Sequence, residues 1–106
     1  MTETSAGSII TLVVTMTVKP EQEAAFLKMT GEFIAWVHAN EAGTLLYTLN
    51  RNSDAGHTFT WVERYRDEAA LAAHGASDEM AAARAQLPDM LAKPPERVRL
   101  QQVAPA

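Results

Sequence analysis

The regular alternation of side chains between residues 57 and 66 is the feature of this sequence that most restricts its fold. Phe59, Trp61, Glu63 and Tyr65 occupy every second position, and threonine, valine and arginine lie between them. Because successive side chains of a β-strand point to opposite faces, this stretch predicts a strand with one aromatic, buried face. Glu63 belongs to that face, and a buried carboxylate needs a hydrogen bond, an ion pair or a proton.

The rest of the chain supplies elements of alternating type. Apolar alternation predicts strands over residues 9–18, 44–51 and 96–103 besides the strand over 57–66. Helical periodicity after Pro20 predicts a helix to about Asn40, and Asp67 is a suitable N-cap for a second helix. That helix is predicted to break near residues 75–76, restart at Ser77 and end at Pro88. The order is βαββαβ, a ferredoxin-like α+β fold with a four-stranded antiparallel sheet and two helices on one face.

Composition narrows the class of protein. The 106 residues are 47% hydrophobic, which predicts a single domain over 1–106 with an ordered core of about 9–103. A net charge of −4 without a Lys/Arg cluster argues against a nucleic-acid partner. Without cysteine, and with three scattered histidines, the sequence predicts no metal site. Residues 1–8 lack the pattern of a signal peptide and no segment is apolar enough to span a membrane, so we expect a cytoplasmic protein.

The second face of the predicted sheet combines threonine with aliphatic side chains. An apolar surface of this kind is better buried than exposed, so it predicts an isologous homodimer formed through this face. The residues assigned to it are Thr11, Val13, Thr15, Leu46, Thr48, Thr58, Thr60, Val62, Arg99 and Val103.

One stretch of the sequence resembles a known family. It reads Tyr47-x-Leu49 and then Phe59-x-x-x-Glu63-Arg64-Tyr65-x-Asp67-Glu68-x-x-Leu71-x-x-His74-x-x-Ser77. This pattern is similar to that of the antibiotic biosynthesis monooxygenases, small dimeric α+β-barrel proteins. The resemblance extends from residue 10 to residue 103 and is most specific over residues 63–74.

The resemblance implies a homodimer with a pocket in each subunit between the sheet and its helices. It also implies oxidation of a small or polycyclic aromatic phenol or quinol by O2 without metal or flavin, so we expect no cofactor. Other members degrade haem, isomerise a sugar phosphate or have no known activity. The haem-degrading pattern is not matched, because Val14 or Thr15 stands where it has an asparagine and the second helix lacks tryptophan. Glu79 stands where many relatives have a second histidine.

Two residues are candidates for acid–base chemistry. His74 is suited to removing a proton from a bound phenol or enol at neutral pH, and the alternative is a helix-end histidine bonded to a nearby carbonyl. Glu63 either orients His74 or acts as the base itself. Its structural alternative is to accept backbone N–H groups at the start of the helix that follows Asp67.

Aromatic side chains are candidates for the walls of a substrate pocket. A slot between aromatic rings suits a flat substrate, although such a cluster also serves simply to fill a core. The candidates are Tyr47, Phe59, Trp61 and Tyr65 on the core face of the sheet and Phe33 and Trp36 on the first helix.

The leading hypothesis from the sequence is a cofactor-independent monooxygenase acting on an aromatic substrate and O2. One alternative is a non-catalytic dimer that binds a small metabolite or acts in a stress response. Another is a sugar-phosphate isomerase, which would need cationic groups in the pocket. None is predicted on the core face of the sheet.

Overall fold

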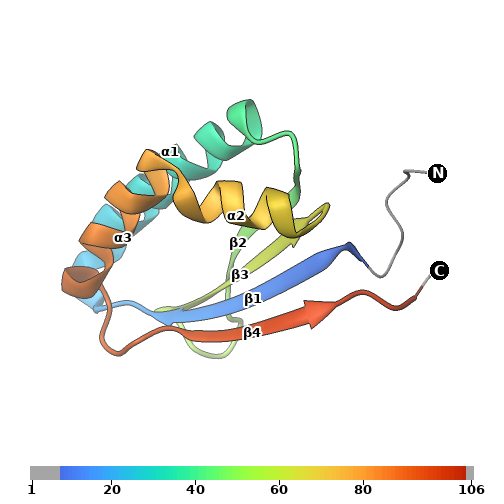
Figure 1. Cartoon of the computed structure of the whole chain (residues 1–106). Coiled ribbons are helices and arrows are strands. Elements are labelled where there is room, and N and C mark those ends of the chain that lie inside the picture. The colour runs from blue at the N-terminus through green and yellow to red at the C-terminus, as the bar shows by residue number, and fades with distance from the viewer. Residues whose placement is uncertain (1–7, 105–106) are drawn as a thin grey trace, which may run out of the picture.

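The structure is a computed structural model that describes residues 8–104, so most of the segment on which the signal-peptide prediction depends lies outside the described residues. Its elements alternate between strands and helices along the chain (Figure 1). They are β1 (Ile10–Thr17), a short 3-10 helix η2 (Pro20–Gln22), α1 (Glu23–Asn40), β2 (Thr44–Arg51), β3 (Thr58–Tyr65), α2 (Glu68–Ala76), α3 (Asp78–Met90) and β4 (Glu96–Gln101).

The four strands form one antiparallel sheet in the order β2-β3-β1-β4. The helices α1, α2 and α3 lie on the same side of this sheet (Figure 1). The predicted ferredoxin-like α+β fold is therefore confirmed. The predicted second helix is present as the two consecutive helices α2 and α3.

The register of β4 differs from the prediction. Arg99 lies opposite Leu12 and Arg97 lies opposite Val14, so both arginines project to the face that the helices cover. Val98 and Leu100 project to the uncovered face instead. The assignment of Arg99 to the uncovered face was wrong because β4 alternates arginine with aliphatic residues, and only its pairing with β1 decides which set faces inward.

Capping side chains define the start of α2 and of α3, as predicted. The Asp67 carboxylate accepts a hydrogen bond from the Ala70 N–H at 2.9 Å. The Ser77 hydroxyl accepts one from the Met80 N–H at 3.0 Å and donates to the His74 carbonyl at 3.1 Å. Ser77 therefore ends α2 and begins α3 with one side chain.

The end of α3 was predicted too early. The helix continues past Pro88 to Met90, and the Leu91 N–H bonds to the Leu87 carbonyl at 3.0 Å. A proline in the last turn removes one backbone donor, and the turn closes around it through its neighbours.

The core lies between the sheet and the helices in two groups. The larger group packs α1 against β1, β2 and β3, and the smaller one places Tyr65 beneath α2 together with Ile10 and Leu12. The buried members of the larger group are Met16, Val18, Phe26, Phe33, Val37, Tyr47, Phe59, Trp61, Met90 and Leu91. Within residues 8–104 no helix has both the length and the apolar character needed to cross a bilayer.

Candidate active site

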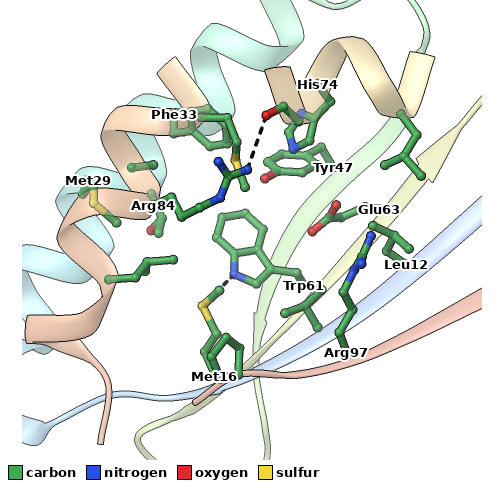
Figure 2. Close-up of a pocket in the computed structure, with 18 residues that line it drawn as sticks. Leu12, Met16, Met29, Phe33, Tyr47, Trp61, Glu63, His74, Arg84 and Arg97 are labelled. Carbon is green, nitrogen blue, oxygen red and sulfur yellow. Dashed lines mark hydrogen bonds between the residues drawn. The ribbon is translucent and has the colours of Figure 1, made fainter. Parts of the chain in front are cut away.

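A pocket of about 400 Å³ opens between the helix-covered face of the sheet and the helices. This volume is within the range of small-molecule sites. Most of the lining is aliphatic or aromatic, with a few polar groups among it (Figure 2). The lining residues are Leu12, Val14, Met16, Met29, Thr30, Phe33, Tyr47, Trp61, Glu63, Leu71, His74, Gly75, Met80, Ala83, Arg84, Leu87, Pro95 and Arg97.

His74 enters the pocket from α2 and is 3% exposed. Its Nδ1 lies 2.9 Å and 3.1 Å from the two carboxylate oxygens of Glu41. A carboxylate only accepts hydrogen bonds, so Nδ1 is the donor to Glu41. Nε2 is buried and has no hydrogen-bond partner among the described residues. Glu41 therefore fixes the orientation of the imidazole ring, and Nε2 is left without a partner at the pocket wall.

Glu41 directly follows α1, and its own N–H caps the helix by bonding to the Val37 carbonyl at 2.9 Å. Its Oε1 also accepts a hydrogen bond from the Thr44 hydroxyl at 2.6 Å. Sequence reasoning missed this residue. One signal was present, because a carboxylate at the negative end of a helix dipole is locally unfavourable and such a conflict often marks a functional site.

Glu63 lies on β3 and also lines the pocket, but no hydrogen bond joins it to His74 in residues 8–104. Its Oε1 accepts a hydrogen bond from the Tyr65 hydroxyl at 2.6 Å. Burial raises the pKa of the Glu63 carboxyl, while the Tyr65 hydrogen bond and the charges of His74 and Arg97 act in the opposite direction. Burial and the neighbouring Glu63 raise the pKa of Tyr65 far above its usual value, so its hydroxyl stays protonated and donates.

Three of the predicted aromatic residues line the pocket. The Tyr47 ring centroid lies 5.0 Å from that of Trp61 and 5.1 Å from that of His74. The Phe33 ring centroid lies 5.8 Å from the ring centroids of both Tyr47 and His74. Burial, followed by the charges of Glu63 and Glu41, raises the pKa of Tyr47 far above its usual value, so its hydroxyl is a neutral donor.

The other three aromatic candidates lie outside the lining. Phe59 packs against Phe26 in the core, with ring centroids 5.3 Å apart. Trp36 is half-buried and stacks on Phe33, with ring centroids 6.2 Å apart. Tyr65 is fully buried behind the wall and contacts the site through Glu63.

Two arginines that the sequence did not indicate also line the pocket. Arg84 extends from α3 and Arg97 from β4 (Figure 2). The expectation that the core face carries no cationic group was wrong, because the register of β4 turns Arg97 inward. Within residues 8–104, no group of three or more His, Asp or Glu side chains is placed to hold a metal ion.

Comparison with known sequences identifies the family. The sequence profile described as antibiotic biosynthesis monooxygenase matches residues 9–86. The chain belongs to this family. No curated protein matches the chain.

Solved structures agree with this assignment to the antibiotic biosynthesis monooxygenases. A candidate antibiotic biosynthesis monooxygenase from Caulobacter crescentus is 33% identical, with a TM-score of 0.88 and 92% of each chain covered. A protein from Mycobacterium tuberculosis is 25% identical, with a TM-score of 0.85 over 93% of this chain and 99% of that one. A conserved protein from Methanosarcina mazei, 23% identical, has the same fold, with a TM-score of 0.86 over 92% of this chain and 96% of that one.

Proposed function

We propose that this antibiotic biosynthesis monooxygenase family member oxidises an aromatic phenol or quinol with O2, using His74 as the base and no cofactor. One observation carries the proposal: a buried histidine whose Nδ1 is held by Glu41 has its Nε2 unpaired at the wall of a largely apolar pocket. A base placed in this way can take a proton from a bound hydroxyl or activated methylene group.

The chemistry then belongs mainly to the substrate. Proton transfer to Nε2 leaves an electron-rich anion and a positively charged imidazole, which the Glu41 carboxylate stabilises. The anion donates electrons to O2. For an anthrone, the methylene carbon becomes a carbonyl that keeps one oxygen atom, and the other leaves as water. All the electrons that reduce O2 come from the substrate, so this reaction needs no external reductant.

Other residues that line the pocket would position the substrate for this reaction. Phe33, Tyr47 and Trp61 provide aromatic walls against which a flat ring can stack. The indole N–H of Trp61 already donates to the Met16 sulfur at 3.3 Å, so the ring acts as a surface rather than as a donor. The Tyr47 hydroxyl is suited to donating a hydrogen bond to an oxygen of the substrate.

Arg84 and Arg97 favour a second candidate function, isomerisation of a sugar phosphate, because they supply the cations that this reaction would need. The lining argues against it. A sugar requires many hydrogen-bonding groups, and most of this wall is aliphatic or aromatic. A dimer that binds a small aromatic metabolite without reaction is the other alternative, and activity measurements distinguish it.

We further propose that the protein acts as a homodimer joined through the uncovered face of the sheet. Val98 is 54% exposed, Leu100 is 48% exposed and Leu46 is 37% exposed on that face. Burying these side chains against a second copy would remove apolar surface from water.

Oxygen uptake tests the oxygenase. Wild-type protein is incubated with anthrone or a hydroquinone, and uptake is compared with that of His74→Ala. Loss of the base should slow turnover by about 100-fold. His38→Ala is the matched control, because His38 is exposed on α1 and is not among the residues that line the pocket. Equal rates in His74→Ala and wild type would exclude His74 as the base, and no uptake by wild type would favour the ligand-binding alternative.

A further inference from the structure

The two pocket arginines interrupt a largely apolar lining that also includes Glu63 and His74. Arg84 reaches the pocket from α3 and Arg97 from β4, so the guanidinium groups come from different layers of the fold (Figure 2). Neither is used in the proton transfer assigned to His74. The pocket therefore carries positive charge that the proposed chemistry leaves unexplained.

Neither arginine forms an ion pair within residues 8–104, whereas other arginines do. Arg51 pairs with Glu23 at 2.9 Å, and Arg99 pairs with Glu68. The hydrogen bond of Arg84 goes to the Gly75 carbonyl at 3.4 Å. Arg97 acts on Glu63 only through its charge, because their separation exceeds that of an ion pair.

We propose that the pocket binds an aromatic compound with an anionic group, and that Arg84 and Arg97 hold this group. The inference rests on the proposed function only in using the same pocket. Both arginines are exposed, so they would hold the anionic group at the edge of the pocket. A guanidinium binds a carboxylate or phosphate through paired N–H donors. The two arginines thus select for the acid, and the aromatic walls select for the ring.

The aromatic walls of the pocket also indicate which kind of molecule carries the anionic group. Phe33, Tyr47 and Trp61 surround the cavity with ring surfaces, which suit a flat hydrophobic body. A sugar would leave most of these surfaces without a suitable partner. An aromatic carboxylate matches both the apolar lining and the two cations.

Binding without oxygen tests this inference separately from turnover. The probes are hydroxynaphthoic acid and its neutral amide, which have the same ring system, with naphthyl phosphate as a second source of anionic oxygen. Binding is followed by calorimetry for wild type, Arg84→Gln, Arg97→Gln and the double variant. Arg66→Gln is the control, because Arg66 is exposed and lies outside this lining.

We expect the acid to bind wild type about tenfold more tightly than the amide. Each single arginine variant should lose several-fold of this preference, the double variant should lose all of it, and Arg66→Gln should keep it. Added salt should weaken binding of the acid but not of the amide. Naphthyl phosphate binding more tightly than the acid would assign the anion as a phosphate rather than a carboxylate.

Three results would overturn the inference: equal affinity for acid and amide, an acid preference that survives in the double variant, or no binding of any probe. The oxygenase is judged separately, because oxygen uptake with neutral hydroquinones and its dependence on His74 do not require an anionic group.

Discussion

At the scale of single residues, the site consists of two carboxylates with different environments. Glu41 contacts His74 and Thr44 and lies partly at the surface, with 11% of its side chain exposed. Glu63 is buried among aromatic residues and has Tyr65 as its hydrogen-bond donor. The Glu41 carboxylate is suited to stabilising a positive charge on His74, whereas burial favours the protonated form of Glu63.

The role of Glu41 can be separated from ligand binding. Glu41→Gln keeps the size of the side chain but removes the charge that faces Nδ1 of His74. We expect kcat for oxygen uptake to fall by about 10- to 100-fold, with little change in the Kd of a bound aromatic. The control is Glu32→Gln, which removes an exposed carboxylate paired only with Lys28. Unchanged kcat in Glu41→Gln would show that this carboxylate does not assist His74.

The burial of Glu63 predicts a pH-dependent stability. Its pKa in the folded state is raised above the ordinary value of 4.5, so the folded state binds more protons than the unfolded state above that pH. Stability should therefore fall as the pH rises from 4.5 through the raised pKa.

Glu63→Gln removes this dependence and still accepts the Tyr65 hydroxyl. At about pH 8, the variant should be more stable than wild type, and below pH 4.5 the difference should vanish. Urea denaturation at several pH values measures this difference in stability between Glu63→Gln and wild type. A difference that does not change with pH would contradict the raised pKa.

At the scale of elements, the site depends on how α2 packs against the start of β2. α2 carries His74, and Glu41 lies in the connection between α1 and β2. Gly43 in this connection accepts the Arg66 N–H through its carbonyl at 2.9 Å and lies directly against α2. The close approach of Gly43 to Ala70 therefore sets the position of His74 relative to Glu41.

Gly43→Ala should disturb this packing. A Cβ at this position would lie 2.6 Å from the Ala70 Cβ, and α2 would have to shift because Ala70 has no flexible side chain. We expect a loss of about 1–3 kcal/mol in the free energy of unfolding, together with slower turnover. Urea denaturation and oxygen uptake measure the two effects.

Gly31→Ala is the matched control for this substitution. Gly31 lies within α1, and an added Cβ would meet nothing within 4 Å. The control should be stabilised by roughly 0.5–1 kcal/mol, since alanine favours helix more than glycine does. Equal stability of Gly43→Ala and wild type would show that α2 tolerates the shift.

At the scale of the whole molecule, the helices cover one face of the sheet and leave the other exposed (Figure 1). The exposed face carries the aliphatic side chains Leu46, Val98 and Leu100. The pocket that His74 lines is on the opposite, helix-covered face. A second copy can therefore bind to the uncovered face without closing the pocket.

The proposed dimer is tested by its mass in solution. Val98→Glu places a charge on the edge strand β4 of the uncovered face, where a dimer would bury it. We expect wild type to have twice the chain mass of 11.6 kDa by light scattering, and Val98→Glu to have the monomer mass. Leu27→Glu is the control, because Leu27 is an exposed leucine on α1. A monomeric wild type would contradict the dimer.

The sequence by itself determined the order of the elements and the inner face of β3. Alternation over residues 57–66 and the caps Asp67 and Ser77 are local properties, so the strand and both helix starts could be predicted. The same alternation placed Trp61 and Glu63 on the face that lines the pocket.

Only the tertiary structure decided which groups meet inside the pocket. Glu41 and His74 are 33 residues apart, and their contact depends on how α2 packs against the end of α1. Arg97 faces the pocket because β4 pairs with β1 in one of two registers that its alternating sequence would allow. Local patterns specify the faces of each element, whereas contacts between distant segments depend on packing and strand register, which no short stretch of sequence encodes.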